Sequence, residues 1–250
     1  MTNQGLGDPY RLADVDPTIS PDERMLQPGM SADVYLNVGR SAINVLRTLY
    51  QSQMIRTQPA SILDFGCGHG RIARHLRAWA PDAALYAADV RADGIAFCAS
   101  QFGCVPVQLT PTFGEVTLPK SMDLIWVGSV FTHIDRARMT VLFDWLWDSL
   151  APGGHLVITT HGAFAKDLSD SGQRKFFTPK KWAEVVEQYQ RTGAGYASYD
   201  REDLGEWGFS LTSDAEIARL GEGKPDGRLR MFLSGGWARL QDVFAWQKVA

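Results

Sequence analysis

The sequence predicts an α/β fold in which a largely parallel sheet is covered by helices. Two observations support this prediction. Short apolar runs, typical of strands buried on both faces, alternate along the chain with longer stretches whose apolar residues recur at helical spacing. The 250 residues, 45% of them hydrophobic, are also enough for one sizeable α/β domain with additions.

Composition narrows the classes of partner and compartment. The net charge of −3 lacks the strongly basic character of most nucleic-acid-binding domains, so no nucleic acid is expected as a partner. The three cysteines, Cys67, Cys98 and Cys104, have no zinc-type spacing and favour a reduced setting. No apolar run approaches the roughly eighteen residues of a membrane span, and no signal-peptide pattern opens the chain. We therefore expect a soluble, cytoplasmic protein.

The chain is predicted to begin with an arm and to continue as one domain. Prolines interrupt residues 1–30 too often for a long helix or a central strand. From Ser31, a suitable helix N-cap, to about Gln53, apolar residues form one broad stripe, which predicts a helix. We therefore expect an N-terminal arm over residues 1–30 and a single α/β domain over residues 31–250.

The first buried strand leads directly into a glycine-rich turn. Residues 62–65 are mostly apolar and form the strand, and apolar residues recur at helical spacing over residues 72–76, so a helix should begin near Gly70. Between them lies the run Gly66-Cys67-Gly68-His69-Gly70. Because glycine has no Cβ, a ligand can approach this backbone closely, and the start of the helix adds unpaired N–H groups. A nucleotide-type ligand is expected here, at the carboxyl end of the strand.

The spacing of the turn separates it from two other nucleotide-binding motifs. A dinucleotide fingerprint requires the pattern G-x-G-x-x-G, but Arg71 occupies the position of the third glycine. A phosphate-binding loop requires a Gly-Lys-Ser/Thr ending, which is absent. With Asp64 two residues before the first glycine, the segment resembles the first motif of the class I S-adenosylmethionine-dependent methyltransferases. The alternative is a generic turn of the same fold that binds another ligand.

This resemblance implies a fold, a cofactor and binding residues. The fold would be a Rossmann-like seven-stranded mixed sheet in the order 3-2-1-4-5-7-6, with the last strand antiparallel and helices on both faces. The cofactor would be S-adenosyl-L-methionine. Asp64 would hold the ammonium group of its methionine part. The turn formed by Gly66, Cys67, Gly68 and Gly70 would admit its carboxylate and ribose.

A second apolar strand, over residues 84–90, places Asp89 about twenty residues beyond the glycines. A carboxylate at this strand end can accept hydrogen bonds from both ribose hydroxyls, so Asp89 and the adjacent Val90 are predicted to contact the cofactor. The alternative is that Asp89 caps the next helix. That helix is predicted over residues 92–102, and a third strand over residues 105–109.

A fourth buried strand begins at Met122 and opens into the polar residues that follow Gly128. Ligands bind at the carboxyl ends of strands in this fold, so Gly128 and Ser129 are predicted to contact the cofactor. A hydroxyl acceptor becomes competent for in-line methyl transfer when a base takes its proton. His133 is one candidate base, because an unperturbed imidazole is largely neutral at pH 7. The alternative is that His133 packs on or caps the next helix, predicted over residues 136–150.

The second candidate base is His161. The run Ala151-Pro152-Gly153-Gly154 reads as a helix stop, and residues 155–160 as a fifth strand that ends beside His161. The resemblance favours His133 as the base, because in such methyltransferases the loop after the fourth strand runs beside the methionine part of the cofactor. His161 is then expected to line the acceptor site.

The last third of the chain is predicted to contain a substrate cap and a terminal hairpin. Residues 163–213 are too long for a plain crossover and are rich in aromatic residues, which indicates an inserted cap. Within it, Thr178 followed by proline begins a helix that runs to Arg191. Two strands, over residues 228–234 and 242–248, form the hairpin.

Together these features predict a methyltransferase that modifies a small-molecule or sugar hydroxyl. The run Gly235-Gly236-Trp237 resembles a subgroup often associated with sugar and glycan modification. The alternatives are an RNA or protein methyltransferase and a non-catalytic cofactor-binding regulator. The fourth strand does not end in the Asn/Asp-Pro-Pro-Tyr/Phe motif of many nitrogen methylases. No metal is expected, because serine, threonine and histidine replace the carboxylates of metal-dependent relatives.

Overall fold

The computed structural model describes residues 10–110, 116–199 and 207–249. The chain divides into two compact units, Met1–Pro111 and Thr112–Ala250, and each is described by itself. Of the helices in the described ranges, none is long and apolar enough to cross a membrane.

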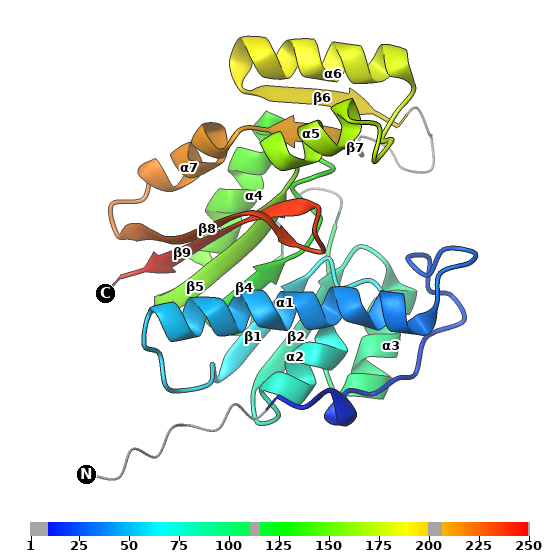
Figure 1. Cartoon of the computed structure of the whole chain (residues 1–250). Coiled ribbons are helices and arrows are strands. Elements are labelled where there is room, and N and C mark those ends of the chain that lie inside the picture. The colour runs from blue at the N-terminus through cyan, green and yellow to red at the C-terminus, as the bar shows by residue number, and fades with distance from the viewer. Residues whose placement is uncertain (1–9, 111–115, 200–206, 250) are drawn as a thin grey trace. The chain divides into compact units, whose positions relative to one another are not determined.

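The main sheet has seven strands in the order β3-β2-β1-β4-β5-β9-β8, and β6 and β7 form a separate two-stranded sheet (Figure 1). Parallel strands alternate with helices along the chain, so the predicted α/β Rossmann-like class is confirmed. The strands at the end of the order are labelled β9 and β8, where 7 and 6 were predicted, because β6 and β7 lie outside the main sheet.

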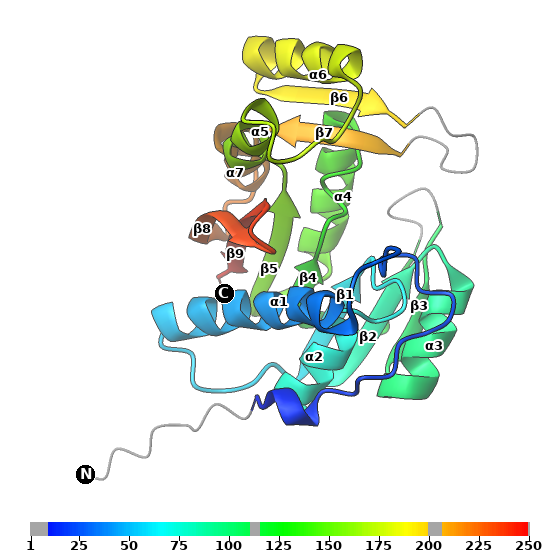
Figure 2. The same ribbon diagram turned by 45° about the vertical axis from the view of Figure 1, so that its right-hand side comes forward.

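The first unit contains three parallel strands and three helices. Every residue of β1 is buried, as expected of a strand covered on both faces. The hydroxyl of Ser31 caps α1 by accepting the N–H of Val34 at 3.3 Å, and Gly103 ends α3 in the left-handed conformation. In Figure 2, α2 lies beside α1, and α3 packs on β2 and β3. The elements are α1 (Ala32–Ser52), β1 (Ser61–Phe65), α2 (Ala73–Trp79), β2 (Ala84–Asp89), α3 (Ala92–Phe102) and β3 (Val105–Gln108), preceded by a 3-10 turn at Leu12–Asp14.

The second unit contains the remaining strands of the main sheet. Strand β5 pairs with β4 in parallel and with β9 antiparallel, and β8 and β9 form the predicted terminal hairpin. The side chain of Asp135 caps α4 by accepting the N–H of Arg138 at 3.0 Å. The elements are β4 (Met122–Val127), α4 (Arg136–Asp148), β5 (Leu150–Thr160), α7 (Asp214–Glu222), β8 (Gly227–Trp237) and β9 (Gln241–Lys248).

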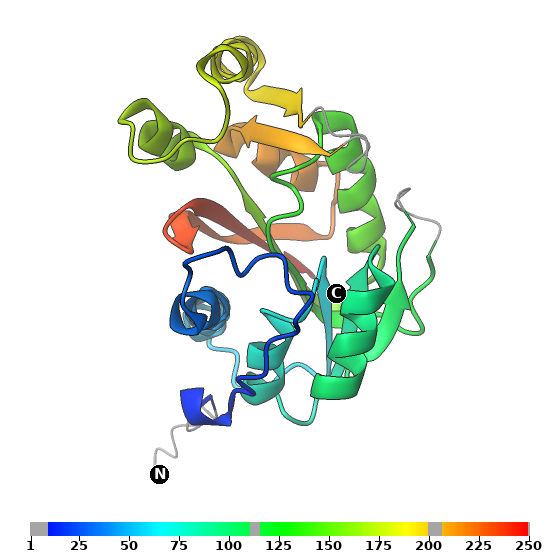
Figure 3. The same cartoon turned by 90° about the vertical axis from the view of Figure 1, so that its right-hand side faces the viewer.

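The described residues of the predicted cap, 163–199 and 207–213, form two helices and two strands. The cap residues Val185, Phe209 and Leu211 are buried together, and aromatic residues of the same segment pack on them. Thr178 caps α6 as predicted, accepting the N–H of Lys181. In Figure 3, α6 is seen end-on beside β6 of the two-stranded sheet. The elements are α5 (Ala163–Asp170), α6 (Pro179–Thr192), β6 (Ala194–Ser198) and β7 (Gly208–Thr212).

The helix after the glycine turn begins later than predicted. It starts at Ala73 and not near Gly70. Gly70 has φ +75°, a left-handed conformation that cannot continue into a right-handed helix, so the turn extends through Ile72.

The fifth strand begins earlier than predicted, at Leu150 and not at His155. Met122 pairs with Leu150 and Leu124 with His155, so the register shifts by several residues within the predicted helix stop. Gly153, at φ +83°, allows this irregular pairing because glycine tolerates the left-handed region.

Candidate functional site

The glycine turn of the first unit is held by hydrogen bonds to the end of β2. The N–H groups of Gly66 and Cys67 both donate to the carbonyl of Ala88, at 2.8 and 3.1 Å. The N–H of Gly68, the next residue of the turn, donates to Oδ2 of Asp89 at 2.8 Å. The turn is therefore fixed before any ligand binds.

The glycines of this turn serve different purposes. A Cβ on Gly68 would meet no atom within 4 Å, so the space above it is open to a ligand. A Cβ on Gly70 would lie 2.4 Å from the ring of Phe102, so this glycine allows internal packing. Cys67 is 5% exposed, which leaves mainly its backbone to face a ligand.

Asp64, at the end of β1, is a buried carboxylate with an unfilled hydrogen-bonding position. It is 1% exposed and accepts the backbone N–H of Ala73, but its Oδ2 has no hydrogen-bond partner among the described residues. Burial raises the pKa of Asp64 to about 7, and the negative charge of Asp89 acts in the same direction. A cation beside Oδ2 would reverse this effect.

Asp89 bridges the turn and the end of β2. Its Oδ1 accepts the N–H of Arg91 at 2.9 Å while Oδ2 holds Gly68. The N-cap position of α3 is Arg91, so Asp89 does not take the capping role that was its alternative. Val90, beside it, has a 41% exposed side chain, and its carbonyl accepts the Nε2 group of Gln108.

A buried arginine connects residues of the predicted N-terminal arm to the glycine turn. Arg74 is 1% exposed and donates to the carbonyls of Asp16 and Thr18 at 3.0 and 2.7 Å. Its Nε donates to the carbonyl of Gly70 at 3.0 Å. The sequence analysis missed this residue, although a charged side chain in the apolar stripe of a short helix was the signal available.

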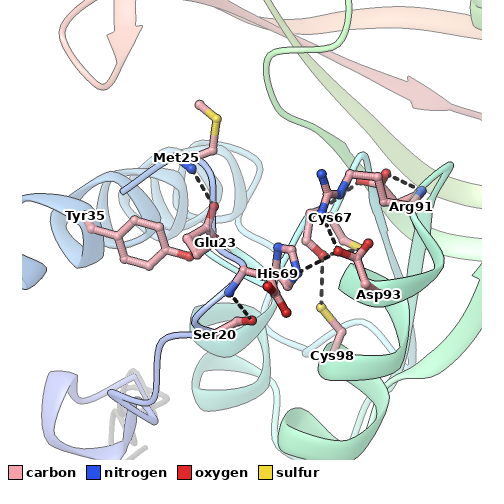
Figure 4. Close-up of polar contacts among 12 residues, drawn as sticks. Ser20, Glu23, Met25, Tyr35, Cys67, His69, Arg91, Asp93 and Cys98 are labelled. Atoms are coloured by element: carbon pink, nitrogen blue, oxygen red, sulfur yellow. Dashed lines mark hydrogen bonds and ion pairs between the residues drawn. The ribbon is translucent and has the colours of Figure 1, made fainter. Parts of the chain in front are cut away.

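The arm is held at a second point, by Tyr35 and Glu23 (Figure 4). The hydroxyl of the fully buried Tyr35 donates to Oε2 of Glu23 at 2.5 Å, and Oε1 of Glu23 accepts the N–H of Met25. The guanidinium of Arg71 lies 5.8 Å from the centre of the Tyr35 ring. Residues far apart in sequence therefore gather beside the glycine turn.

In the second unit, Ser129 follows β4 in a strained conformation. Its φ of +65° is uncommon for a residue with a side chain, and such strain occurs mainly where surrounding structure enforces it. Its N–H donates to Oγ1 of Thr159, and its hydroxyl accepts the amide of Gln241 at 2.9 Å. Gly128 precedes it, and a Cβ there would lie 2.7 Å from Nε1 of Trp126.

His133 lies in the loop after β4 and contacts the cap. Its Nδ1 is 3.0 Å from the carbonyl oxygen of Gly208 and 2.8 Å from the hydroxyl oxygen of Tyr199. The ring of Trp207 lies 5.8 Å away, between ring centres. Burial lowers the pKa of His133, and the hydrogen bond to Gly208 opposes this effect. Asp135, not His133, caps α4.

His161 lies at the end of β5 in an aromatic environment. It is 5% exposed and stacks on Phe209, with ring centres 4.7 Å apart and an interplanar angle of 18°. Burial lowers the pKa of His161 to about 3, and the charges of His133 and Arg174 act in the same direction. Its Nδ1 has no hydrogen-bond partner in the part of the chain that the structure describes.

Strand β7 of the cap brings both histidine loops together. Gly208 N–H donates to the carbonyl of His133 at 2.9 Å, and Thr212 N–H donates to the carbonyl of His161 at 2.8 Å. Both predicted base candidates therefore border the same strand of the cap.

Comparison with known proteins identifies the family. Residues 41–214 match a family described as a methyltransferase domain. The chain belongs to this family. Its predicted resemblance to the class I S-adenosylmethionine-dependent methyltransferases is confirmed, and so is its assignment as an enzyme of that type.

Individual relatives are distant. A tRNA N(3)-methylcytidine methyltransferase of Schizosaccharomyces pombe (strain 972 / ATCC 24843) is 24% identical over 200 residues, which cover 73% of this chain and 78% of the relative. An S-adenosylmethionine-dependent methyltransferase from Clostridium acetobutylicum ATCC 824 has a TM-score of 0.57 at 12% identity, covering 91% and 96% of the two chains. The plantazolicin methyltransferase BpumL, solved with SAH, has a TM-score of 0.56 at 17% identity, covering 92% and 91%. The solved structures establish a shared fold.

The cofactor of this methyltransferase is S-adenosylmethionine, and the first unit fits it in three respects. The unpartnered Oδ2 of Asp64 suits an ammonium group. The open space above Gly68 suits a ligand against the backbone. Within the described part of the chain, each oxygen of Asp89 accepts one N–H, and because a carboxylate has about four lone-pair sites, ribose hydroxyls can be added.

One acidic residue near the His161 loop of this methyltransferase was not predicted from the sequence. Asp242 is 3% exposed, and its Oδ1 accepts the N–H of Gly235 at 2.7 Å. Burial raises the pKa of Asp242. A Cβ on Gly162 would lie 2.0 Å from its Oδ2, which places this carboxyl beside the loop that bears His161. The available signal was an acid that begins an otherwise apolar strand.

Proposed function

We propose that this methyltransferase modifies a hydroxyl group of a small molecule or sugar and that His133 is the general base. The observation that carries the proposal is the setting of His133, a neutral imidazole that follows β4 and is bordered by Tyr199 and Trp207 of the cap. Small-molecule sites are mostly apolar and aromatic and contain a few placed polar groups.

In the proposed reaction, S-adenosylmethionine supplies an electrophilic methyl group on its sulfonium. Asp64, Gly68 and Asp89 bind and orient the cofactor. The imidazole of His133 accepts the proton of the acceptor hydroxyl while the bond from oxygen to the methyl carbon forms and the bond from that carbon to sulfur breaks. Because burial lowers the pKa of His133, the imidazole is neutral near pH 7 and able to accept this proton.

We further propose that residues 163–213 act as a substrate cap on the domain of residues 31–250, and that residues 1–30 form an arm. His161 is proposed to line the acceptor site as an aromatic surface. Its stacking on Phe209 and the low pKa of its ring, about 3, favour this role over proton transfer near neutral pH. Ser129 and Gly128 are proposed to contact the cofactor after β4.

An RNA acceptor is the second candidate, and the fission-yeast relative named for tRNA supports it. The cap also combines cations with aromatic rings. The guanidinium of Arg174 lies 5.7 Å from the ring centre of Phe176, and Lys181 Nζ lies 5.4 Å from that of Phe177. Such pairs suit single-stranded nucleic acids. The net charge of −3 weighs against this candidate.

Transfer of a labelled methyl group distinguishes these acceptors. The full chain is incubated with S-adenosylmethionine carrying a radiolabelled methyl group and either a panel of hydroxylated sugars and small molecules or total tRNA. We expect label in at least one hydroxylated compound and none in tRNA. Label in tRNA alone would overturn the small-molecule proposal, and binding of S-adenosylhomocysteine without transfer to any acceptor would indicate a regulator.

A further inference from the structure

One nitrogen of the His133 ring contacts two groups of the cap. Its Nδ1 lies 3.0 Å from the carbonyl oxygen of Gly208 and 2.8 Å from the hydroxyl oxygen of Tyr199. A carbonyl oxygen can only accept a hydrogen bond, so the short contact with Gly208 requires a hydrogen on Nδ1. The hydroxyl of Tyr199 is then the second acceptor of the same N–H.

We propose that Gly208 and Tyr199 fix the tautomer of His133, with the hydrogen on Nδ1 and a free lone pair on Nε2. The tautomer of a neutral histidine is set by the hydrogen bond of its other nitrogen. Tyr199 is thus a positioning residue, and Nε2 is the atom that accepts the substrate proton. This inference rests on the proposed role of His133 as the general base.

The backbone of the cap holds Gly208 in the required place. Gly208 N–H donates to the carbonyl of His133 at 2.9 Å. Gly208 therefore forms hydrogen bonds with both the backbone and the ring of His133. A Cβ on Gly208 would lie 2.3 Å from the carbonyl oxygen of Ala197 and 2.7 Å from the ring of Tyr196. Only glycine therefore allows β7 to approach β6 this closely while its carbonyl faces His133.

Tyr199 is held in a similar way. Its N–H donates to the carbonyl of Trp207 at 3.2 Å, and its ring lies 5.8 Å from that of Phe177, between ring centres. Burial raises the pKa of Tyr199 to about 12, so its hydroxyl stays protonated near neutral pH and remains a hydrogen-bonding partner of the imidazole. The fold of the predicted cap therefore places the two groups that keep the hydrogen on Nδ1 and the lone pair of His133 on Nε2.

Nitrogen-15 NMR of the full chain with labelled histidine tests the tautomer without any acceptor. The spectrum of His133→Gln assigns the His133 signals among the five histidines. We expect the wild-type ring to carry its hydrogen mainly on Nδ1. Tyr199→Phe keeps the ring of the tyrosine but removes one of the two acceptors. The fraction with hydrogen on Nε2 should then rise about fivefold, the effect of one ordinary hydrogen bond.

Tyr196→Phe is the matched control. The hydroxyl of Tyr196 also lies in the cap but accepts from Nη2 of Arg138 at 3.1 Å, so this variant should leave the His133 signals unchanged. A wild-type ring with its hydrogen mainly on Nε2 would overturn the inference, whether or not the variants fold. So would identical His133 signals in folded Tyr199→Phe and wild type.

Turnover provides the second readout once an acceptor is found. Tyr199→Phe should lower kcat up to about fivefold, because the imidazolium that forms at His133 loses one of the two acceptors of its Nδ1–H. KM for the acceptor should stay within about twofold, because the ring of residue 199 is kept. A change in KM alone would count against the positioning role. If the tautomer is as expected but His133→Gln transfers methyl groups normally, the proposed base is wrong and the assignment of the tautomer stands.

Discussion

At the scale of single residues, the first unit depends on two buried carboxylates. Asp64 and Asp89 end neighbouring parallel strands, and each is less than a tenth exposed. Asp89 accepts two backbone N–H groups, whereas one oxygen of Asp64 has no partner within residues 10–110, 116–199 and 207–249. Asp64 is therefore the carboxylate whose ionisation should respond most to a bound cation.

The affinity for S-adenosylhomocysteine should increase with pH because of Asp64. Its pKa is about 7 in the folded chain, so the ionised form that pairs with an ammonium group dominates only above that pH. Between pH 8 and pH 6, calorimetry should show the affinity fall about tenfold, because each pH unit below a pKa reduces the ionised fraction about tenfold.

Asp64→Asn is the control for this dependence and should bind weakly at both pH values. The pH dependence of stability provides an independent check on the direction of the pKa shift of Asp64. Because the folded-state pKa lies above the ordinary value of 3.8, ionisation of Asp64 costs the folded state free energy as pH rises from about 4 to 7. Asp64→Asn should therefore raise Tm at pH 8 and not at pH 4. A wild-type affinity that is flat from pH 6 to pH 8 would contradict the assignment.

Asp89→Ala should weaken S-adenosylhomocysteine binding about tenfold or more. Hydrogen bonds to a charged group contribute about 1.5–3 kcal/mol, and the ribose would lose them. Gly68→Val should be at least as harmful, since it fills open space with a branched side chain at φ +50°. Asp82→Ala, which removes an exposed carboxylate of the same unit, should bind normally in the same calorimetric titration. Normal binding by Asp89→Ala would remove this residue from the site.

At the scale of elements, the glycine turn depends on the close approach of α3. A Cβ on Gly94 of this helix would lie 2.4 Å from the carbonyl oxygen of Gly68. Cys98, on the same helix, places its Sγ 3.6 Å from that oxygen. The helix therefore contacts the turn at the carbonyl oxygen of Gly68.

Gly94→Ala should displace α3 from the turn and reduce cofactor affinity. Forced overpacking typically costs about 1–3 kcal/mol of stability, which urea unfolding would report. Calorimetry with S-adenosylhomocysteine should show about tenfold weaker binding, since the displaced group is the carbonyl of Gly68. Gly223→Ala is the matched control, because a Cβ there meets nothing within 4 Å, and it should change stability by less than about 0.5 kcal/mol. Equal behaviour of the two variants would show that the turn does not depend on α3.

Elements that follow local rules could be predicted from the sequence. Ser31 and Thr178 cap the helices expected after them, and Gly103 ends α3. The start of α2 could not be predicted, because the left-handed Gly70 is favoured by packing against Phe102, a contact between distant segments. The register shift before His155 likewise depends on pairing with another strand.

At the scale of the whole molecule, the cofactor turn could be predicted because glycines and acids mark it locally. The residues that contact the two candidate bases could not be predicted from the sequence. Tyr199 meets His133 across 66 positions of sequence, and Arg74 meets Thr18 across 56. No periodicity or spacing encodes such contacts. The sequence predicted both histidines as candidates, and the family resemblance favoured His133. The contacts of His133 with Tyr199 and of His161 with Phe209 add structural grounds for this order.

In the proposed mechanism, His133 takes the proton of the acceptor, and the first unit binds the cofactor through Asp64, Gly68 and Asp89. Single-turnover quench of His133→Gln, with a known acceptor and calorimetry alongside, tests it most directly. A general base contributes about 10²–10⁴-fold, so methyl transfer should slow by that factor while S-adenosylhomocysteine affinity stays within about twofold of wild type. His161→Gln should transfer at a near-normal rate and mainly raise the acceptor KM. A near-normal single-turnover rate in His133→Gln would contradict the account.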